Sequence, residues 1–186
     1  MRLQDCDLRL ASPDGLSGRN IREAIRRHRL AYRDVASATN RLTLISAIVP
    51  PDAVTVHTLH CLKGVVPFDD QVVLCCLLNS LVTNYLVRMW VTTHLGTSTV
   101  ERLPVPRPPA TSWHAGRLRD LGRGLLQAGG RQPAAYAETQ GLAALLYGLS
   151  PAEFALVLES FPLIEAGVKE AAAGWHRRLV AESGWV

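Results

Sequence analysis

Short apolar runs separated by turn-forming residues fill the first half of the sequence and predict strands. Residues 42–49 are rich in β-branched side chains and end at two prolines, which is typical of a buried strand. Residues 54–60 alternate apolar and polar positions, so they predict a second strand that pairs with the first across the Pro-Pro-Asp turn. Residues 30–36 also fit a short strand, although arginines at helical spacing precede them and favour a helix that ends near His28.

A longer apolar pattern, from Asp69 or Asp70 to about Trp90, predicts one continuous helix. The apolar face of this helix comprises Leu74, Leu77, Leu78, Leu81 and Tyr85. A polar stripe accompanies it and comprises Asn79, Ser80, Thr83, Asn84 and Arg88.

The proline-rich residues 104–109 stop regular structure, and everything after them is predicted to be helical. One helix covers about residues 113–128 and is closed by two glycines, and the next begins at Pro133. The run Ser-Pro-Ala-Glu at residues 150–153 is a capping box that opens a third helix, and a last helix follows Pro162.

These patterns divide the chain into three parts. Residues 1–19 have no clear periodicity and are expected to be a frayed or truncated start, residues 20–109 form an α/β core, and residues 110–186 form a helical C-terminal subdomain. The expected fold class is α+β, with a small mixed sheet and a long helix followed by an α-helical tail.

The positive charge of the chain is almost entirely arginine. The formal net charge is +4 and the sequence pI is about 9.1, while Lys63 and Lys169 are the only lysines. The planar fork of arginine can grip phosphates or guanine edges. A genome rich in G and C also encodes its positive charge as arginine, so composition alone does not establish a nucleic-acid ligand.

The four cysteines have neither disulfide-framework nor zinc-site spacing, because Cys75 and Cys76 are adjacent and the other two, Cys6 and Cys61, stand alone. A reducing cytoplasm therefore fits best. The sequence does not open on a signal-peptide pattern. Its most apolar stretch, residues 72–87, is interrupted by polar side chains, so no membrane partner is expected.

No recognisable catalytic motif occurs in the chain. It has no Gly-x-Gly cofactor loop, no phosphate-binding loop, no Asn-Pro-Pro-Tyr type tetrapeptide and no Gly-x-Ser-x-Gly elbow. His57 and His60 are the best metal candidates, but residues three apart on a strand point to opposite faces and no third ligand is evident. Neither a catalytic residue, nor a metal, nor a cofactor is therefore expected here.

Four segments carry a resemblance. Residues 32–51 contain an Arg-Asp pair, a Thr-Asn-Arg turn and an apolar strand ending in Pro-Pro. Residues 77–85 contain Leu-Leu-Asn-Ser and Asn-Tyr, residues 96–106 read Gly-Thr-Ser-Thr-Val-Glu-Arg-Leu-Pro-Val-Pro, and residues 158–169 begin a terminal helix. In this order they resemble the target-recognition region that follows the catalytic domain in TaqI-like (type IIG) adenine-specific DNA methyltransferases, fused restriction-methylation enzymes and methylases of BREX phage-defence systems. Leu42 departs from the family's turn, since it follows Arg41 directly and delays the threonine.

The resemblance implies a fragment that binds double-stranded DNA while a separate catalytic domain, in cis or in trans, flips out and methylates adenine. That domain would precede residue 1 and would bind S-adenosylmethionine, so the chain is not expected to transfer a methyl group by itself. Phosphate contacts are expected from Arg22, Arg26, Arg29 and Arg33.

Base reading is expected from loops, where a recognition domain varies on a fixed scaffold. The candidates are Asn40, Arg41, His57, His60, Lys63, His94, Thr97 and Ser98. Asparagine can pair with adenine, and arginine or lysine with guanine. Two alternatives stay open, because Asn40 and Arg41 can instead stabilise their own turn, and the polar stripe can either face DNA or pack against the sheet or another domain.

Two other functions also remain open. The chain could be a protein-interaction or scaffolding domain whose arginines are ordinary surface charge, or an enzyme with an unfamiliar site built on His57 or His60. Salt-dependent DNA binding separates the first of these from DNA recognition.

Overall fold

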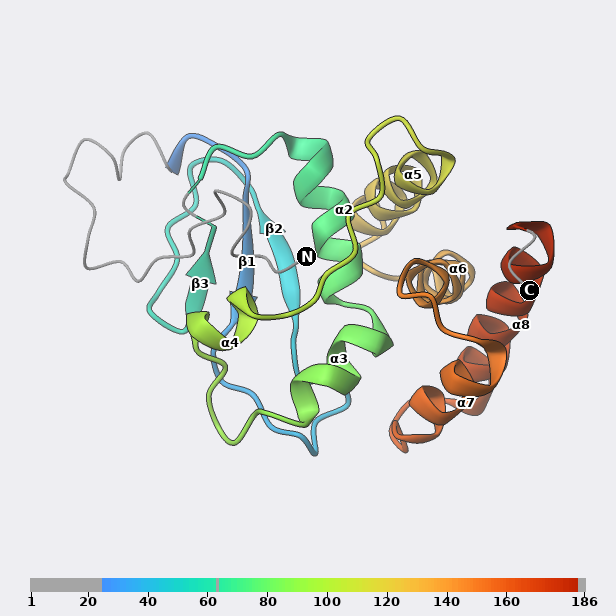
Figure 1. The fold of residues 1–186 in the computed structure, drawn as a ribbon. Coiled ribbons are helices and arrows are strands. Elements are labelled where there is room, and N and C mark those ends of the chain that lie inside the picture. The colour runs from blue at the N-terminus through green and yellow to red at the C-terminus, as the bar shows by residue number, and fades with distance from the viewer. Residues whose placement is uncertain (1–24, 63, 184–186) are drawn as a thin grey trace.

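The computed structural model describes residues 25–62 and 64–183, so the predicted start, Arg22 and Lys63 lie outside the described residues. A small three-stranded sheet is packed against one helix, α2 (Phe68–Leu78), and the first helices that follow residue 109 pack on the other side of α2, with the last two helices beyond them (Figure 1). The described residues contain seven helices, so the predicted α+β class with a helical C-terminal part is confirmed.

The sheet is built around its first strand. β1 (Arg29–Arg33) lies between β2 (Ser46–Val49) and β3 (Leu59–Cys61), and both pairs are antiparallel. The sheet is therefore antiparallel rather than mixed. The register places Tyr32 opposite both Ser46 and His60.

The predicted hairpin between residues 42–49 and 54–60 is wrong, because β3 pairs with the far side of β1. The connection instead leaves the sheet at Asp52, which has a left-handed backbone (φ 61°) and donates its N–H to the carbonyl of Ile25 at 2.8 Å. The alternation of residues 54–58 thus belongs to an exposed connection, in which Val54 is 80% exposed.

Arg29 and Arg33 belong to a strand and not to a basic helix, which confirms the alternative prediction for residues 30–36. Alternate residues of a strand share a face. Arg29, Ala31 and Arg33 therefore share one face of β1, while Leu30 and Tyr32 enter the buried core on the other.

The single helix predicted from Asp69 or Asp70 to Trp90 is in fact two, α2 (Phe68–Leu78) and α3 (Leu81–Arg88), which are bent by 60°. Ser80 causes the break, because its side chain accepts a hydrogen bond from the Thr83 N–H and so starts a new helix. The Gln140 side chain accepts the N–H of Leu81 at 2.7 Å. The apolar periodicity continues across this break, so periodicity alone could not reveal it.

The four helices after residue 109 agree with the sequence pattern, whereas the short helix over residues 97–101 lies where a loop was expected. A short α4 (Thr97–Glu101) precedes the prolines, and four helices follow, α5 (Trp113–Gln127), α6 (Pro133–Leu146), α7 (Pro151–Glu159) and α8 (Ala166–Ser183). The predicted capping box at Ser150 and Glu153 is present, and Gly129 and Gly130 close α5 with positive φ.

One buried cluster extends from the sheet into the C-terminal helices. It includes Leu30 of β1, Leu77 of α2, Leu118 of α5, Leu142 of α6 and Leu179 of α8. The core is therefore continuous past the boundary expected at residue 109. The division of the chain at that boundary stays a prediction. Within the described residues no single helix is long and apolar enough to cross a membrane.

Candidate nucleic-acid interface

Three loops meet at one end of the sheet, where β1 ends and β2 and β3 begin. Backbone hydrogen bonds join the loops here. Asp34 donates to Thr58 (2.9 Å) and accepts from Leu95 (2.8 Å), and Ala36 donates to Thr93 (3.1 Å). We call residues 34–45, 56–58 and 92–96 the loop end of the sheet, and it lies at the lower side of the sheet in Figure 1.

Most candidate base-reading residues lie at or next to the loop end. Asn40, Arg41, His57 and His94 belong to it, and His60 lies in β3 just beyond it. Thr97 and Ser98 follow it directly at the start of α4. Of the eight candidates, seven thus lie in three segments that border the same end of the sheet, although they are up to 58 positions apart in the sequence, and Lys63 lies outside the described residues. Their individual roles remain predictions.

The polar stripe, whose role the sequence left open, is buried. Ser80, Thr83 and Asn84 are each 0% exposed. The side-chain oxygen of Asn84 accepts the backbone N–H groups of Thr43 and Leu44, both at 2.8 Å. Those bonds replace strand pairing, which explains why the predicted strand over residues 42–49 begins only at Ser46.

Arg88 completes this support of the loop end. It donates to the carbonyl oxygens of Asn40 (2.6 Å) and Ser160 (2.8 Å), and its guanidinium lies 3.9 Å from the centre of the Phe161 ring. Burial lowers the pKa of Arg88. The stripe therefore packs inward and holds the turn that carries Asn40 and Arg41, whose contacts with Arg88 use only their carbonyl oxygens.

A carboxylate that sequence reasoning missed lies at the centre of the loop end. The Oδ2 of Asp34 is 2.9 Å from Nδ1 of His94, and its Oδ1 is 3.5 Å from Nε2 of His60. Burial acts to raise the pKa of Asp34, but the hydrogen bonds and charge of His94, followed by those of His60, outweigh it and hold that pKa below its ordinary value. The Arg-Asp pair was visible in the sequence. The position of its partner His60 depends on the register of β3, and that of His94 depends on the contacts of residues 93–95 with residues 34–36.

The three described arginines predicted to contact phosphates differ in exposure. Arg26 is exposed. Arg29 is only 9% exposed and donates to the carbonyl of Ala53, so it offers the least surface. Arg33 is partly buried, and its Nε has no hydrogen-bond partner among the described residues.

The net positive charge of the chain is confined to the half that contains the loop end. Residues 25–109 carry nine Lys and Arg against five Asp and Glu, whereas residues 110–183 carry seven of each. In the described part of the chain, the two arginine–carboxylate pairs, Arg117–Glu138 and Arg123–Asp69, both use arginines of α5. Among the described residues, the arginines around the sheet therefore form no ion pair with a carboxylate.

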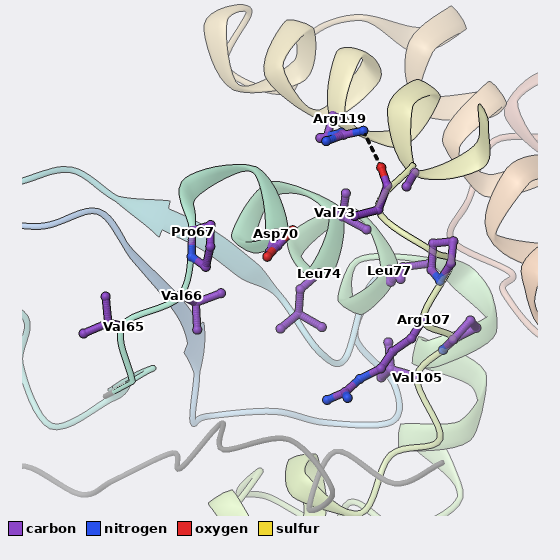
Figure 2. Close-up of a pocket in the computed structure, with 14 residues that line it drawn as sticks. Val65, Val66, Pro67, Asp70, Val73, Leu74, Leu77, Val105, Arg107 and Arg119 are labelled. Carbon is purple, nitrogen blue, oxygen red and sulfur yellow. Dashed lines mark hydrogen bonds between the residues drawn. The ribbon is translucent and has the colours of Figure 1, made fainter. Parts of the chain in front are cut away.

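An apolar pocket of about 440 Å³ lies away from the loop end, between α2 and the proline-rich segment (Figure 2). Val73, Leu74 and Leu77 of α2 line it, and Arg107 and Arg119 lie at its edge. Arg119 is bound to the carbonyl of Ala110 at 2.9 Å. The lining suits an apolar group and supplies no phosphate-binding loop.

Metal chemistry finds no support in residues 25–62 and 64–183, where no three His, Cys, Asp or Glu side chains are grouped to hold an ion. Cys75 and Cys76 are 8% and 7% exposed, so both side chains fill the core, as the apolar run around them would suggest. Burial raises the pKa of the Cys76 thiol to about 12, which keeps it protonated and unreactive.

Comparison with protein-family models, with curated proteins and with solved structures found no match to this chain.

Proposed function

We propose that this chain is the DNA target-recognition part of an adenine-specific DNA methyltransferase or of a fused restriction-modification enzyme that acts in the cytoplasm. Its partners are double-stranded DNA and a catalytic domain, in cis or in trans, that supplies S-adenosylmethionine and methylates the flipped adenine. The observation that carries the proposal is that three separate segments, which contain most of the candidate base-reading residues, meet through backbone hydrogen bonds at the loop end of the sheet.

The arrangement suits the reading of nucleobases, because exposed side chains at the loop end stand on a loop backbone that is held rigidly. Arg41, His57, His94 and Ser98 are exposed, while the buried Asn84 fixes the backbone beneath the first loop. Side chains held on fixed loops can select base edges without a large loss of conformational entropy on binding.

The distribution of charge suits the same ligand. Positive residues near the sheet can neutralise phosphates and release counterions, and such contacts position a protein on DNA without reading its sequence. In the proposed mechanism, Arg26 and neighbouring basic residues supply this positioning, and the loop end reads the bases. Methyl transfer belongs to the catalytic domain.

The direct test is selection from a library of DNA duplexes by the purified chain at two salt concentrations. Enrichment of one short site is the expected result. Weak, salt-sensitive binding without enrichment would mean that sequence readout requires the catalytic domain. An absence of binding at both salt concentrations would reject the proposal and favour the protein-interaction function.

Charge reversal tests which half of the chain binds. The Arg26→Glu/Arg41→Glu variant should weaken binding to all duplexes and flatten its dependence on salt, because both side chains are exposed and near the sheet. The Arg177→Glu/Arg178→Glu variant is the matched control, since it makes the same charge change on exposed positions of α8. Equal losses in the two variants would indicate a general charge effect and not an interface.

A further inference from the structure

The side chain of Asp34 connects a partly buried histidine with an exposed one. His60 is 17% exposed and its ring centre lies 5.2 Å from that of Tyr32, whereas His94 is 65% exposed. Both rings face the same carboxylate, which is 20% exposed. His60 thus contacts Asp34 on the side of the protein interior, and Asp34 in turn contacts His94 on the side of the solvent.

The carboxylate determines which nitrogen of His94 carries the hydrogen. An ionised carboxylate can only accept hydrogen bonds, so the nitrogen facing it at 2.9 Å, Nδ1, must donate. In a neutral ring the other nitrogen, Nε2, then bears a lone pair. Because the backbone on both sides of His94 is bonded to the segment that follows β1, through the Thr93–Ala36 and Leu95–Asp34 contacts, the position of the ring is constrained as well.

We propose that Asp34 is a positioning residue that presents Nε2 of His94 to DNA as a hydrogen-bond acceptor. This inference rests on the proposed function and deepens it. In the major groove such an acceptor pairs with an exocyclic amino group, which is N6 of adenine or N4 of cytosine. Thymine O4 and guanine O6 and N7 are acceptors at the same edge, so bases that present only these groups are disfavoured.

The first arm of the test needs no DNA. Long-range ¹H–¹⁵N NMR spectra of the full chain at pH 8 report the tautomer of each histidine, and His94→Ala identifies the signals of His94. We expect Nδ1–H in the wild-type chain and a shift toward Nε2–H in Asp34→Asn, because the amide can donate to the ring. A wild-type ring that carries its hydrogen on Nε2 would overturn the inference.

The second arm measures binding to the selected duplex and to duplexes in which single A or C positions are replaced. Asp34→Asn and His94→Ala should each weaken binding to the selected duplex by about tenfold while leaving binding to unrelated duplexes unchanged. The double variant should be no weaker than either single variant, because both remove the same contact. Asp120→Asn, at an exposed position of α5, is the control and should change nothing.

The outcomes separate the inference from the proposed function. If wild type selects a site and both variants select it equally well, the inference is wrong and the proposed function stands. Additive losses of affinity in the double variant would also contradict the inference. So would equal losses of affinity on every duplex together with a lower melting temperature of the protein, because they would indicate a merely structural role. If the wild-type chain binds no duplex, both the inference and the proposed function are wrong.

Discussion

The two halves of the molecule use their polar side chains in different ways. Around the sheet, buried side-chain amides bond to the backbone of loops and strands, as Asn84 does with Thr43 and Leu44 and Gln71 does with Leu30. In the C-terminal half, helices approach closely through small residues, and a Cβ added to Gly141 of α6 would lie 2.8 Å from the backbone nitrogen of His176 in α8.

The difference assigns a separate role to each half. The sheet half holds the loops in place, and the helical half stabilises the sheet half. Loops whose backbones are held by buried amides can change the residues at their tips without changing their course, which is what a recognition surface requires. Tightly packed helices tolerate few changes of side-chain volume, and they keep the sheet and its loops in place. We therefore expect substitutions in the helical half to act on stability, and substitutions at the loop tips to act on binding.

The largest effect is expected from Gly141→Ala. The added methyl group meets backbone atoms of α8 that cannot move independently, so the loss of unfolding free energy should reach or exceed the upper end of the usual ~1–3 kcal/mol for overpacking. Urea unfolding measures it. Gly174→Ala is the matched control, because an added Cβ there meets nothing within 4 Å and should stabilise α8 by about 0.5–1 kcal/mol. Equal effects of the two changes would mean that α6 and α8 do not pack as described.

A smaller loss of unfolding free energy is expected when the side-chain amide of Asn84, which holds the backbone of the first loop, is removed. Asn84→Ala leaves the N–H groups of Thr43 and Leu44 without their acceptor, and it should destabilise the chain by about 2–3 kcal/mol. Hydrogen exchange should show faster exchange at both amides than in the control Thr92→Ala, which changes an exposed residue. Protection unchanged at Thr43 would contradict the role given to Asn84.

Arg88→Lys tests the connection between the halves. Lysine cannot bond the carbonyls of Asn40 and Ser160 together and also stack on Phe161, so a loss of about 1–2 kcal/mol is expected despite the retained charge. Thermal unfolding checks the value. A melting temperature equal to that of wild type would mean that charge alone is sufficient at this position.

The smallest effect is a dependence of stability on pH from His176. This side chain is 0% exposed, and burial, together with the charge of Arg177, lowers its pKa against a smaller opposing effect of the Leu149 backbone. The folded state therefore favours the neutral ring. Stability is retained above the ordinary pKa of histidine, about 6.5, and is lost as the pH falls from there toward the lower folded value.

Urea midpoints measured between pH 8 and pH 5 should fall in wild type, and they should fall less in His176→Gln. His57→Ala removes an exposed histidine and should keep the wild-type slope. A slope that is unchanged in His176→Gln would assign the effect to another group.

The sequence was a good guide wherever local chemistry decides the structure. The capping box at Ser150 and the paired glycines after α5 are local signals, and the helices of the tail follow from them. The fold class and the packing of Cys75 and Cys76 also follow from apolar patterning.

The sequence was a poor guide where distant segments decide. The Leu81 N–H that the break at Ser80 frees is bonded by Gln140, which is 59 positions away, and the contact of Asp34 with His60 depends on which strand lies beside β1. The prediction of a hairpin after residue 49 assumed that neighbours in sequence are neighbours in the sheet. The candidate base readers could be selected by residue type, but their gathering at one end of the sheet could not be predicted.

The central claim is that DNA contacts the loop end, and NMR titration of the ¹⁵N-labelled chain with a selected duplex tests it most directly. We predict shifted or broadened amide signals in residues 34–45, 56–60 and 92–98, with signals of α7 and α8 unchanged. Changes concentrated in α7 and α8, or no changes at DNA concentrations that saturate binding, would contradict the account.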